Sequence, residues 1–218
     1  MSDTLRLGVL VSGRGTNLQS ILDGCASGSI PARVEVVISN RPNVLALDRA
    51  RSAGLTAVCV DFKDYGKWPE SKPRYESDLV AALKQYVVEL VVCAGYDRLA
   101  GETLMNAFPG RIINIHPALL PSFPGLHAQR DALAYGAKVS GATVFFVDPT
   151  VDGGPVIIQE AVPVEEDDTE ESLSERILAV EHRILPVAIT LIARGQAKIE
   201  GRRVRVTNRG CPSWQEEQ

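Results

Sequence analysis

LGVLVSGRGTNLQSIL, residues 7–22, is the stretch that decides the fold, because it passes from a strand through a loop into a helix. Residues 7–11 are an apolar run of the length of a buried strand, and from Leu18 onward the apolar residues recur at helical spacing. Residues 12–15 join the two with glycines that allow a tight turn. A strand that leads directly into a helix is the repeating unit of a parallel sheet.

The same alternation of short apolar runs and amphipathic stretches continues to about residue 139. Strands are expected at 34–38, 56–60, 90–94 and 111–115, and helices at 44–53 and 74–87. This alternation predicts an α/β fold of the Rossmann-like kind: a doubly wound, mostly parallel sheet with helices on both faces.

The C-terminal third departs from this pattern. Residues 142–147 and 155–164 are predicted to be neighbouring strands, joined by a loop at 148–154 with no helix between them. A helix is expected at 168–193 and a final edge strand at 198–206. We expect residues 1–206 to form a single domain and residues 207–218 a polar C-terminal tail.

The composition is that of an ordinary globular protein. Of the 218 residues, 45% are hydrophobic and 23% are charged, and a chain of this length can bury a sizeable core without disulfides or a metal. The formal net charge of −4 argues against a nucleic-acid partner or an anionic membrane, because both attract basic surfaces. A phosphorylated substrate would therefore need a local binding site.

The cysteines and the N-terminal residues indicate a reducing compartment. The cysteines form no C-x-x-C pair and most lie in apolar runs, so they are expected to be reduced core residues. They are Cys25, Cys59, Cys93 and Cys211. The first residues lack the basic and apolar regions of a signal peptide, and no stretch approaches the roughly 18 apolar residues of a membrane span. We expect a cytoplasmic protein.

The loop at residues 12–18 is the first candidate site. Its glycines let the backbone approach an anion, and free N–H groups at a helix N-terminus favour a phosphate. Thr16, followed three residues later by Gln19, predicts a capping box that fixes the start of the helix. A simple tight turn is the alternative interpretation of the same glycines.

A dinucleotide site is the main competing interpretation of this loop, but its fingerprint is incomplete. Leu18 stands where the third glycine belongs, and the second strand ends in Ser39-Asn40-Arg41 without an acidic residue for a ribose. No Gly-Lys-Ser/Thr follows, so the loop is not a P-loop either. A single phosphate monoester fits it best.

Asn114-Ile115-His116-Pro117 is the second candidate site. On a strand Asn114 and His116 face the same way, and Pro117 ends the strand, so both polar groups lie at its C-terminal end. They can supply a proton-transfer group and an amide donor for one developing charge, or they can simply be satisfied locally. The irregular residues 117–125 that follow lie where open α/β sheets place their ligand crevice.

Asp152-Gly153-Gly154-Pro155 is the third candidate site. It is either an ordinary Asp-Gly turn or a carboxylate at a loop edge that orients a histidine and stabilises its charged form. His127 and His182 show no metal-ligand spacing with His116, so no metal site is expected. The sequence contains no nucleophile elbow and no activated cysteine, which favours direct transfer without a covalent enzyme intermediate.

In this order, the segments resemble the folate-dependent formyltransferases over about residues 5–206, and within that family the phosphoribosylglycinamide formyltransferases of purine synthesis. The matching stretches are residues 12–18, 94–98, 114–121, 124–127 and 151–156. The phosphate loop and a late helix that carries Glu181 separate this branch from methionyl-tRNA formyltransferase and formyltetrahydrofolate hydrolase.

The resemblance implies a reaction in which the amine of 5-phosphoribosylglycinamide attacks the formyl carbon of the co-substrate, 10-formyltetrahydrofolate. His116 would be the general acid and the electrostatic partner of the tetrahedral intermediate. Asn114 would hydrogen-bond the formyl oxygen, and Asp152 would hold the histidine. Such a set suits a reaction in which an oxyanion forms while the attacking amine loses a proton.

The resemblance also implies two binding regions. The ribotide would be contacted by the loop and the late helix, at Gly15, Thr16, Asn17 and Glu181, although an ordinary solvated helix charge is the alternative interpretation of Glu181. The folate would be contacted at Lys72, Asp97, Arg98, Leu99, Ala100 and the shared Asn114. A homodimer is implied by resemblance only.

The chain departs from the family pattern at two of these positions. Asp97 stands where the family commonly has an apolar residue, and Lys72 where arginine is usual. Two alternative functions remain: a formyltetrahydrofolate hydrolase, which needs no ribotide site, and a non-catalytic sensor of a phosphorylated metabolite. The loop and Glu181 argue against a hydrolase, and the intact trio Asn114, His116 and Asp152 argues against a sensor.

Overall fold

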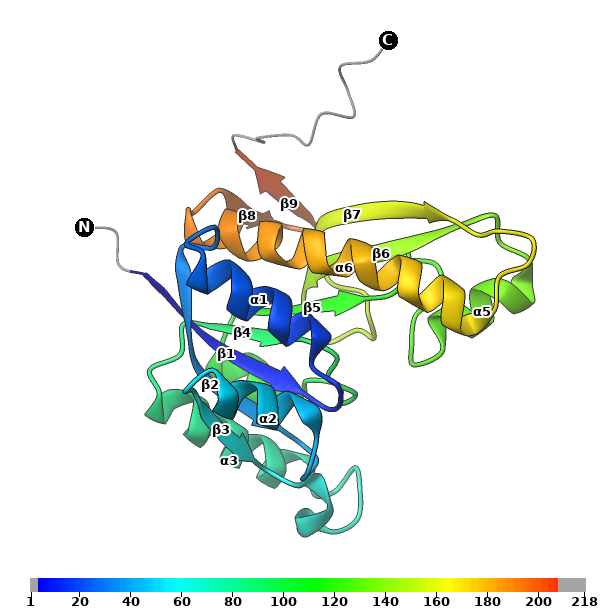
Figure 1. The fold of residues 1–218 in the computed structure, drawn as a ribbon. Helices are drawn as coiled ribbons and strands as arrows, with labels where there is room; N and C mark the ends of the chain where they lie inside the picture. The colour runs from blue at the N-terminus through cyan, green and yellow to red at the C-terminus, as the bar shows by residue number, and fades with distance from the viewer. Residues whose placement is uncertain (1–3, 208–218) are drawn as a thin grey trace.

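The computed structural model describes residues 4–207 of the chain. One sheet has the strand order β3-β2-β1-β4-β5-β6-β7 (Figure 1). Its strands are β1 (Leu5–Val11), β2 (Ala32–Ser39), β3 (Thr56–Cys59), β4 (Leu90–Cys93), β5 (Ile112–His116), β6 (Val139–Phe146) and β7 (Val156–Pro163). The first five are mutually parallel, whereas β6 is antiparallel to β5 and β7 to β6. The predicted α/β fold with a mostly parallel sheet is confirmed.

Helices cover both faces of this sheet, as expected. They are α1 (Thr16–Ala26), α2 (Leu45–Ser52), α3 (Lys72–Gln85), α4 (Glu102–Ala107), α5 (Ala128–Tyr135) and α6 (Glu170–Ala193), with a 3₁₀ helix, η1, at Phe62–Tyr65. The buried side chains of α1, α2 and α6 form one core with one face of the sheet, and those of α3 and α4 form a second core with the other. Alternation along β1 divides its side chains between the two cores, since Val9 joins the first and Leu10 the second.

The C-terminal segment corrects the prediction of a final edge strand at 198–206. The structure has two short strands there, β8 (Ala197–Glu200) and β9 (Arg203–Val206), which pair with each other as a separate antiparallel hairpin. Gly201, with φ of 61°, lies in the turn between them and takes a backbone conformation that favours glycine. The predicted strand pair at 142–147 and 155–164 is present as β6 and β7.

The cysteine prediction is correct for one of the three cysteines in the described range. Cys93 is buried on β4, Cys25 is half-buried, and Cys59 is exposed because β3 is an edge strand. Cys211 and residues 208–218 of the predicted tail lie outside the described residues. Within residues 4–207 no helix is long and apolar enough to cross a membrane.

The sheet order creates a topological switch point between β1 and β4. The chain proceeds from β1 outward to β2 and β3, and then returns to place β4 on the other side of β1. Open α/β sheets bind their ligands at such a point, outside the carboxyl ends of the strands. The loops that follow β1, β4 and β5 therefore mark the edge at which a site is expected.

Candidate active site

His116 is the last residue of β5 and is almost completely buried, with 4% of its surface exposed. Its Nδ1 lies 3.5 Å from Oδ2 of Asp152, which establishes the pairing that the sequence only suggested. Its Nε2 lies 2.8 Å from the backbone oxygen of Phe123. Nε2 is therefore within hydrogen-bond distance of the irregular segment that follows the strand, whereas Nδ1 faces the Asp152 carboxylate at the longer distance of an ion pair.

Asp152 reaches His116 because the loop between β6 and β7 folds back along β5. The loop leaves the sheet where the Val147 N–H donates to the oxygen of Ile112, at the start of β5, and arrives at His116, at its end. Oδ2 of Asp152 also accepts a hydrogen bond of 2.8 Å from the Gly125 N–H. One carboxylate thus ties the β6–β7 loop to the segment after β5.

The glycines after Asp152 are required by close packing of this loop. A Cβ at Gly154 would lie 1.7 Å from the backbone oxygen of Phe146, and one at Gly153 would lie 2.0 Å from Oγ1 of Thr150. Asp152 itself has φ of 48°, which non-glycine residues seldom adopt. Strained backbone of this kind is commonly found at functional sites.

Asn114 and Asp152 line a cavity of about 100 Å³, whereas His116 itself is not part of its lining. The walls come from α3, the segment after β4, and the β6–β7 loop. The lining residues are Lys72, Cys93, Tyr96, Arg98, Leu99, Ala100, Asn114, Phe145, Val147, Asp148, Pro149, Thr150, Val151 and Asp152. Burial raises the pKa of the Cys93 thiol to about 12, so this cysteine stays protonated and is a poor nucleophile.

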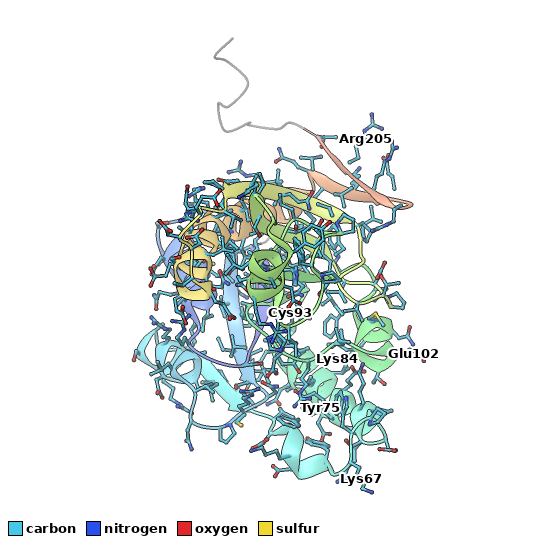
Figure 2. The ribbon with its side chains drawn as sticks, turned by 90° about the vertical axis from the view of Figure 1, so that its right-hand side faces the viewer. Lys67, Tyr75, Lys84, Cys93, Glu102 and Arg205 are labelled. Atoms are coloured by element: carbon cyan, nitrogen blue, oxygen red, sulfur yellow. The ribbon has the colours of Figure 1, made fainter. Side chains whose placement is uncertain are left out.

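Aromatic and acidic side chains position the segment after β4 that forms one wall. The Arg98 guanidinium lies 3.6 Å from the centre of the Phe62 ring, and its Nε is buried without a hydrogen-bond partner among the described residues. The buried carboxylate of Glu76 accepts from the backbone N–H groups of Gly101 and Leu104. Figure 2 shows Tyr75 and Cys93 on this side of the sheet, where both belong to the core beneath the wall.

The loop after β1 ends at Gly15, which is the N-cap of α1. Helix α1 begins at Thr16 as predicted, but the predicted capping box of Thr16 and Gln19 is wrong, because the cap residue is Gly15 with φ of 71° and no side-chain cap bond. The side chain of Gln19 instead bonds to Asp23 and Arg49. The first turn of α1 thus leaves backbone N–H groups free of a side-chain cap, as an anion site requires.

Asn17 and Glu181 lie together beside this loop, on α1 and α6. Nδ2 of Asn17 donates a 2.7 Å hydrogen bond to Oε2 of Glu181, and each residue is 7% exposed. Burial raises the pKa of the Glu181 carboxyl, and the hydrogen bond from Asn17 opposes part of that shift. Oδ1 of Asn17 is buried without a hydrogen-bond partner in the described residues.

The loop after β1 and the histidine after β5 lie at the same edge of the sheet. Adjacent strands are ~4.8 Å apart, so the ends of β1 and β5, with β4 between them, are separated by roughly 10 Å. A single phosphorylated ligand of small-metabolite size can span that gap. Asn114 and the cavity face the same edge.

Some of the site residues predicted from the sequence line the cavity, and others do not. Lys72, Arg98, Leu99, Ala100, Asn114 and Asp152 line the cavity, whereas Asp97 and His116 are absent from its lining. Sequence reasoning missed the wall at 147–151 and the aromatic support of Arg98. The signal for that wall, Asp148-Pro149-Thr150 ahead of Asp152, reads as an ordinary turn when it is considered alone. In the described part of the chain, no three His, Cys, Asp or Glu side chains gather as metal ligands would.

Comparisons with known proteins identify the family to which this fold and site belong. The family described as "Formyl transferase" matches residues 5–189. The chain is 42% identical to the phosphoribosylglycinamide formyltransferase of Mycobacterium tuberculosis over 90% of its length and 89% of that protein. It is 43% identical to the Drosophila melanogaster trifunctional purine biosynthetic protein adenosine-3 over 89% of its length, and it spans 14% of that longer relative.

Solved structures agree with these relatives. The glycinamide ribonucleotide transformylase 1 of Symbiobacterium toebii has a TM-score of 0.91 and 53% identity, covering 95% of this chain and 96% of the other. A formyltetrahydrofolate deformylase from Burkholderia mallei has a TM-score of 0.83 at 25% identity, covering 95% of this chain and 71% of the other. The fold is shared with both, and the sequence is much more similar to the transformylase.

Proposed function

This chain belongs to the formyl transferase family, and we infer that it transfers a formyl group from 10-formyltetrahydrofolate to the amine of 5-phosphoribosylglycinamide. The products are tetrahydrofolate and the formylglycinamide ribonucleotide of de novo purine synthesis. One observation carries this inference. The N-terminus of α1, which has no side-chain cap and lies beside the buried Glu181 carboxylate, is at the same sheet edge as a cavity lined by Asn114 and by Asp152, the partner of His116.

The ribotide binds between the loop after β1 and α6. Its phosphate accepts hydrogen bonds from the free N–H groups of Gly15, Thr16 and Asn17, assisted by the dipole of α1. Glu181, held by Asn17, accepts hydrogen bonds from the hydroxyl groups of the ribotide. The glycinamide amine then lies toward β5, since the phosphate and the histidine are at opposite ends of the gap.

Part of the folate binds in the cavity of about 100 Å³ between α3, the segment after β4 and the β6–β7 loop. Arg98 and Lys72 supply positive charge on the α3 side of the cavity, which suits the carboxylates of a folate. Leu99 and Ala100 add apolar contacts. Because Asn114 lines the cavity and precedes His116 by two residues on one strand, the formyl group is received where both side chains face.

The chemistry requires one bond to form and one to break. The amine nitrogen attacks the formyl carbon, and the resulting oxyanion is stabilised by the Asn114 amide and by the His116 imidazolium. Asp152 orients the ring through the contact between its Oδ2 and Nδ1 of His116. The bond to N10 of the folate then breaks, and one proton passes from the amine to N10, with His116 as the proton-transfer group.

Formyltetrahydrofolate hydrolysis is the second candidate, because it would use the same trio with water in place of the amine. The buried Asn17–Glu181 pair favours the ribotide, since a hydrolase has no need for a carboxylate buried beside an anion loop. The test is the rate of tetrahydrofolate formation from formylfolate with and without the ribotide. A transferase shows turnover that depends on the ribotide, and turnover of equal rate without it identifies a hydrolase.

We further propose that residues 1–206 form one domain, that the protein is cytoplasmic, and that its ligands are the two small molecules alone. The charge that develops on the formyl oxygen is stabilised by Asn114 and His116, so the proposed mechanism includes no metal.

A further inference from the structure

Asp97 makes a set of contacts that ties together the loops after three strands. Its Oδ1 lies 2.9 Å from the hydroxyl of Ser12, which follows β1, and accepts a 2.7 Å hydrogen bond from Nδ2 of Asn40, which follows β2. Its Oδ2 accepts a hydrogen bond from the guanidinium of Arg41. Its own N–H donates to the Ser12 hydroxyl at 3.0 Å. Both carboxylate oxygens are therefore engaged.

Ser12 is the residue at which the loop after β1 begins, and it is held from the β4 side. Its N–H donates to the oxygen of Gly95 at 3.0 Å, and its hydroxyl lies between Asp97 and Asn40. Helix α2 holds the other side of the loop. Nε of Arg49 donates to the oxygen of Arg14 at 2.9 Å. The loop is thus clamped between α2 and the segment after β4.

The residues that Asp97 contacts in this clamp are buried, so its carboxylate is difficult to replace. Asn40 is completely buried and Ser12 is 7% exposed, so loss of the carboxylate leaves a buried amide group without its acceptor. Such a group is costly to leave unpaired, and the loops shift to satisfy it. Ser12, which would also lose a contact, begins the loop whose N–H groups define the proposed anion site.

We propose that Asp97 is a positioning residue of the ribotide half of the site, acting through Ser12 and Asn40, and not a folate-contacting residue. This proposal rests on the proposed function, because it assigns Asp97 to one of the two substrates of that reaction. The neighbouring Arg98 lines the cavity, and its Nε lies 3.9 Å from Oδ1 of Asp97, so the two halves of the site adjoin at these consecutive residues.

The test is the steady-state kinetics of Asp97→Ala with each substrate varied in turn. We expect the KM for the ribotide to rise about tenfold or more, as for the loss of one hydrogen bond to a charged group. The KM for formylfolate should stay within about twofold, since the cavity keeps its lining. Asp97→Asn retains an oxygen that accepts from Asn40, so it should restore most of the ribotide KM.

Two further variants separate positioning from general stability. Asp48→Asn removes an exposed carboxylate that pairs with Arg51 on α2, and it should change neither KM. In Ser12→Ala combined with Asp97→Ala, the ribotide KM should rise less than the product of the two single effects, because both substitutions act on one network.

A rise in the folate KM alone, or equal rises in both KM values, would overturn the proposal. An unchanged ribotide KM in a folded Asp97→Ala variant would also overturn it. Failure of the proposed function is a different result, because the unmodified protein would then show no ribotide-dependent turnover at all.

Discussion

His116 is the residue on which the proposed chemistry depends, because it is buried at the end of β5, faces the same way as Asn114 and is the proposed proton-transfer group. His116→Ala should lower kcat by at least ~10²-fold, as expected for the loss of a positioned acid–base group. The KM for the ribotide should change little, because its phosphate site lies roughly 10 Å away. Thermal unfolding and circular dichroism check that the fold persists.

The matched control for this variant is His127→Gln, which changes an exposed histidine that precedes α5. Its kcat should stay within about twofold of normal. A His116→Ala protein that turns over at nearly the normal rate would remove His116 from the mechanism.

Glu181 gives a second prediction, because its buried carboxylate is proposed to bind the ribotide while its charge lowers the stability of the folded protein. Its folded-state pKa is raised by desolvation, so the native state binds the proton more tightly than the unfolded state does. The contribution to stability is therefore most favourable below the unfolded pKa and is lost as the pH rises through the raised folded value. Glu181→Gln keeps an acceptor for Asn17 and carries no charge, so it should be more stable than the unmodified protein at pH 7.

The measurement is the free energy of unfolding in urea at pH 4 and pH 7 for both proteins. The gain from Glu181→Gln should be larger at pH 7, while the KM for the ribotide rises about tenfold through the loss of a charged acceptor. Glu175→Gln, on the exposed part of the same helix, is the control and should show neither effect. A gain that is larger at pH 4 would contradict the assigned cause.

At the scale of elements, the packing of the loop after β1 decides which glycine can be substituted to test the proposed phosphate site. A Cβ at Gly15 would lie 2.6 Å from Cβ of Ala46, and the position has φ of 71°, so a side chain there would damage the fold and not only the site. A Cβ at Gly13 meets nothing within 4 Å. Gly13 is therefore the better position for a steric test.

Gly13→Val should fold normally and raise the KM for the ribotide by about tenfold or more, because its branches occupy the open side of the loop that the phosphate approaches. The KM for formylfolate should be unchanged. Gly15→Val should instead be destabilised by about 1–3 kcal/mol, as for overpacking at a strained position. If Gly13→Val raises the KM values for the ribotide and for formylfolate equally, the loop is not a dedicated phosphate site.

The sequence was sufficient for the elements whose pattern is local. The strand–loop–helix of residues 7–22 and the long helix α6 are found where hydrophobic spacing predicts them. Helices α4 and α5 were not predicted; α4 has only six residues, which is too short for helical periodicity to stand out, and α5 follows directly on the irregular segment after β5. The capping prediction at Thr16 failed because an N-cap glycine with positive φ satisfies the same turn without a side chain.

The candidate site was only partly predictable for a different physical reason. Asn114 and His116 share a face because of strand geometry, which sequence spacing alone specifies. The approach of Asp152 to His116 depends on a loop that folds back along β5 and on glycines that permit its close packing. The engagement of Asp97 with Ser12 and Asn40 depends on three loops that meet only when the sheet is assembled.

At the scale of the whole molecule, the order of the strands organises the reaction. Because β1 and β4 are neighbours at the switch point, the anion loop after β1, the segment after β4 and the histidine at the end of β5 come to one edge. Helix α6 then covers α1 and brings Glu181 to Asn17 from 164 residues away in sequence. The two substrates are therefore proposed to meet above β4 and β5, with the trio between them.

The fate of a labelled formyl carbon tests this central claim most directly. The protein is incubated with formylfolate carrying ¹³C in the formyl group and with the ribotide, and the products are followed by NMR. Direct transfer predicts that the label appears in the formylglycinamide ribonucleotide in a one-to-one ratio with tetrahydrofolate, and that no label is released as formate. Label recovered as free formate at the rate of tetrahydrofolate formation would contradict it.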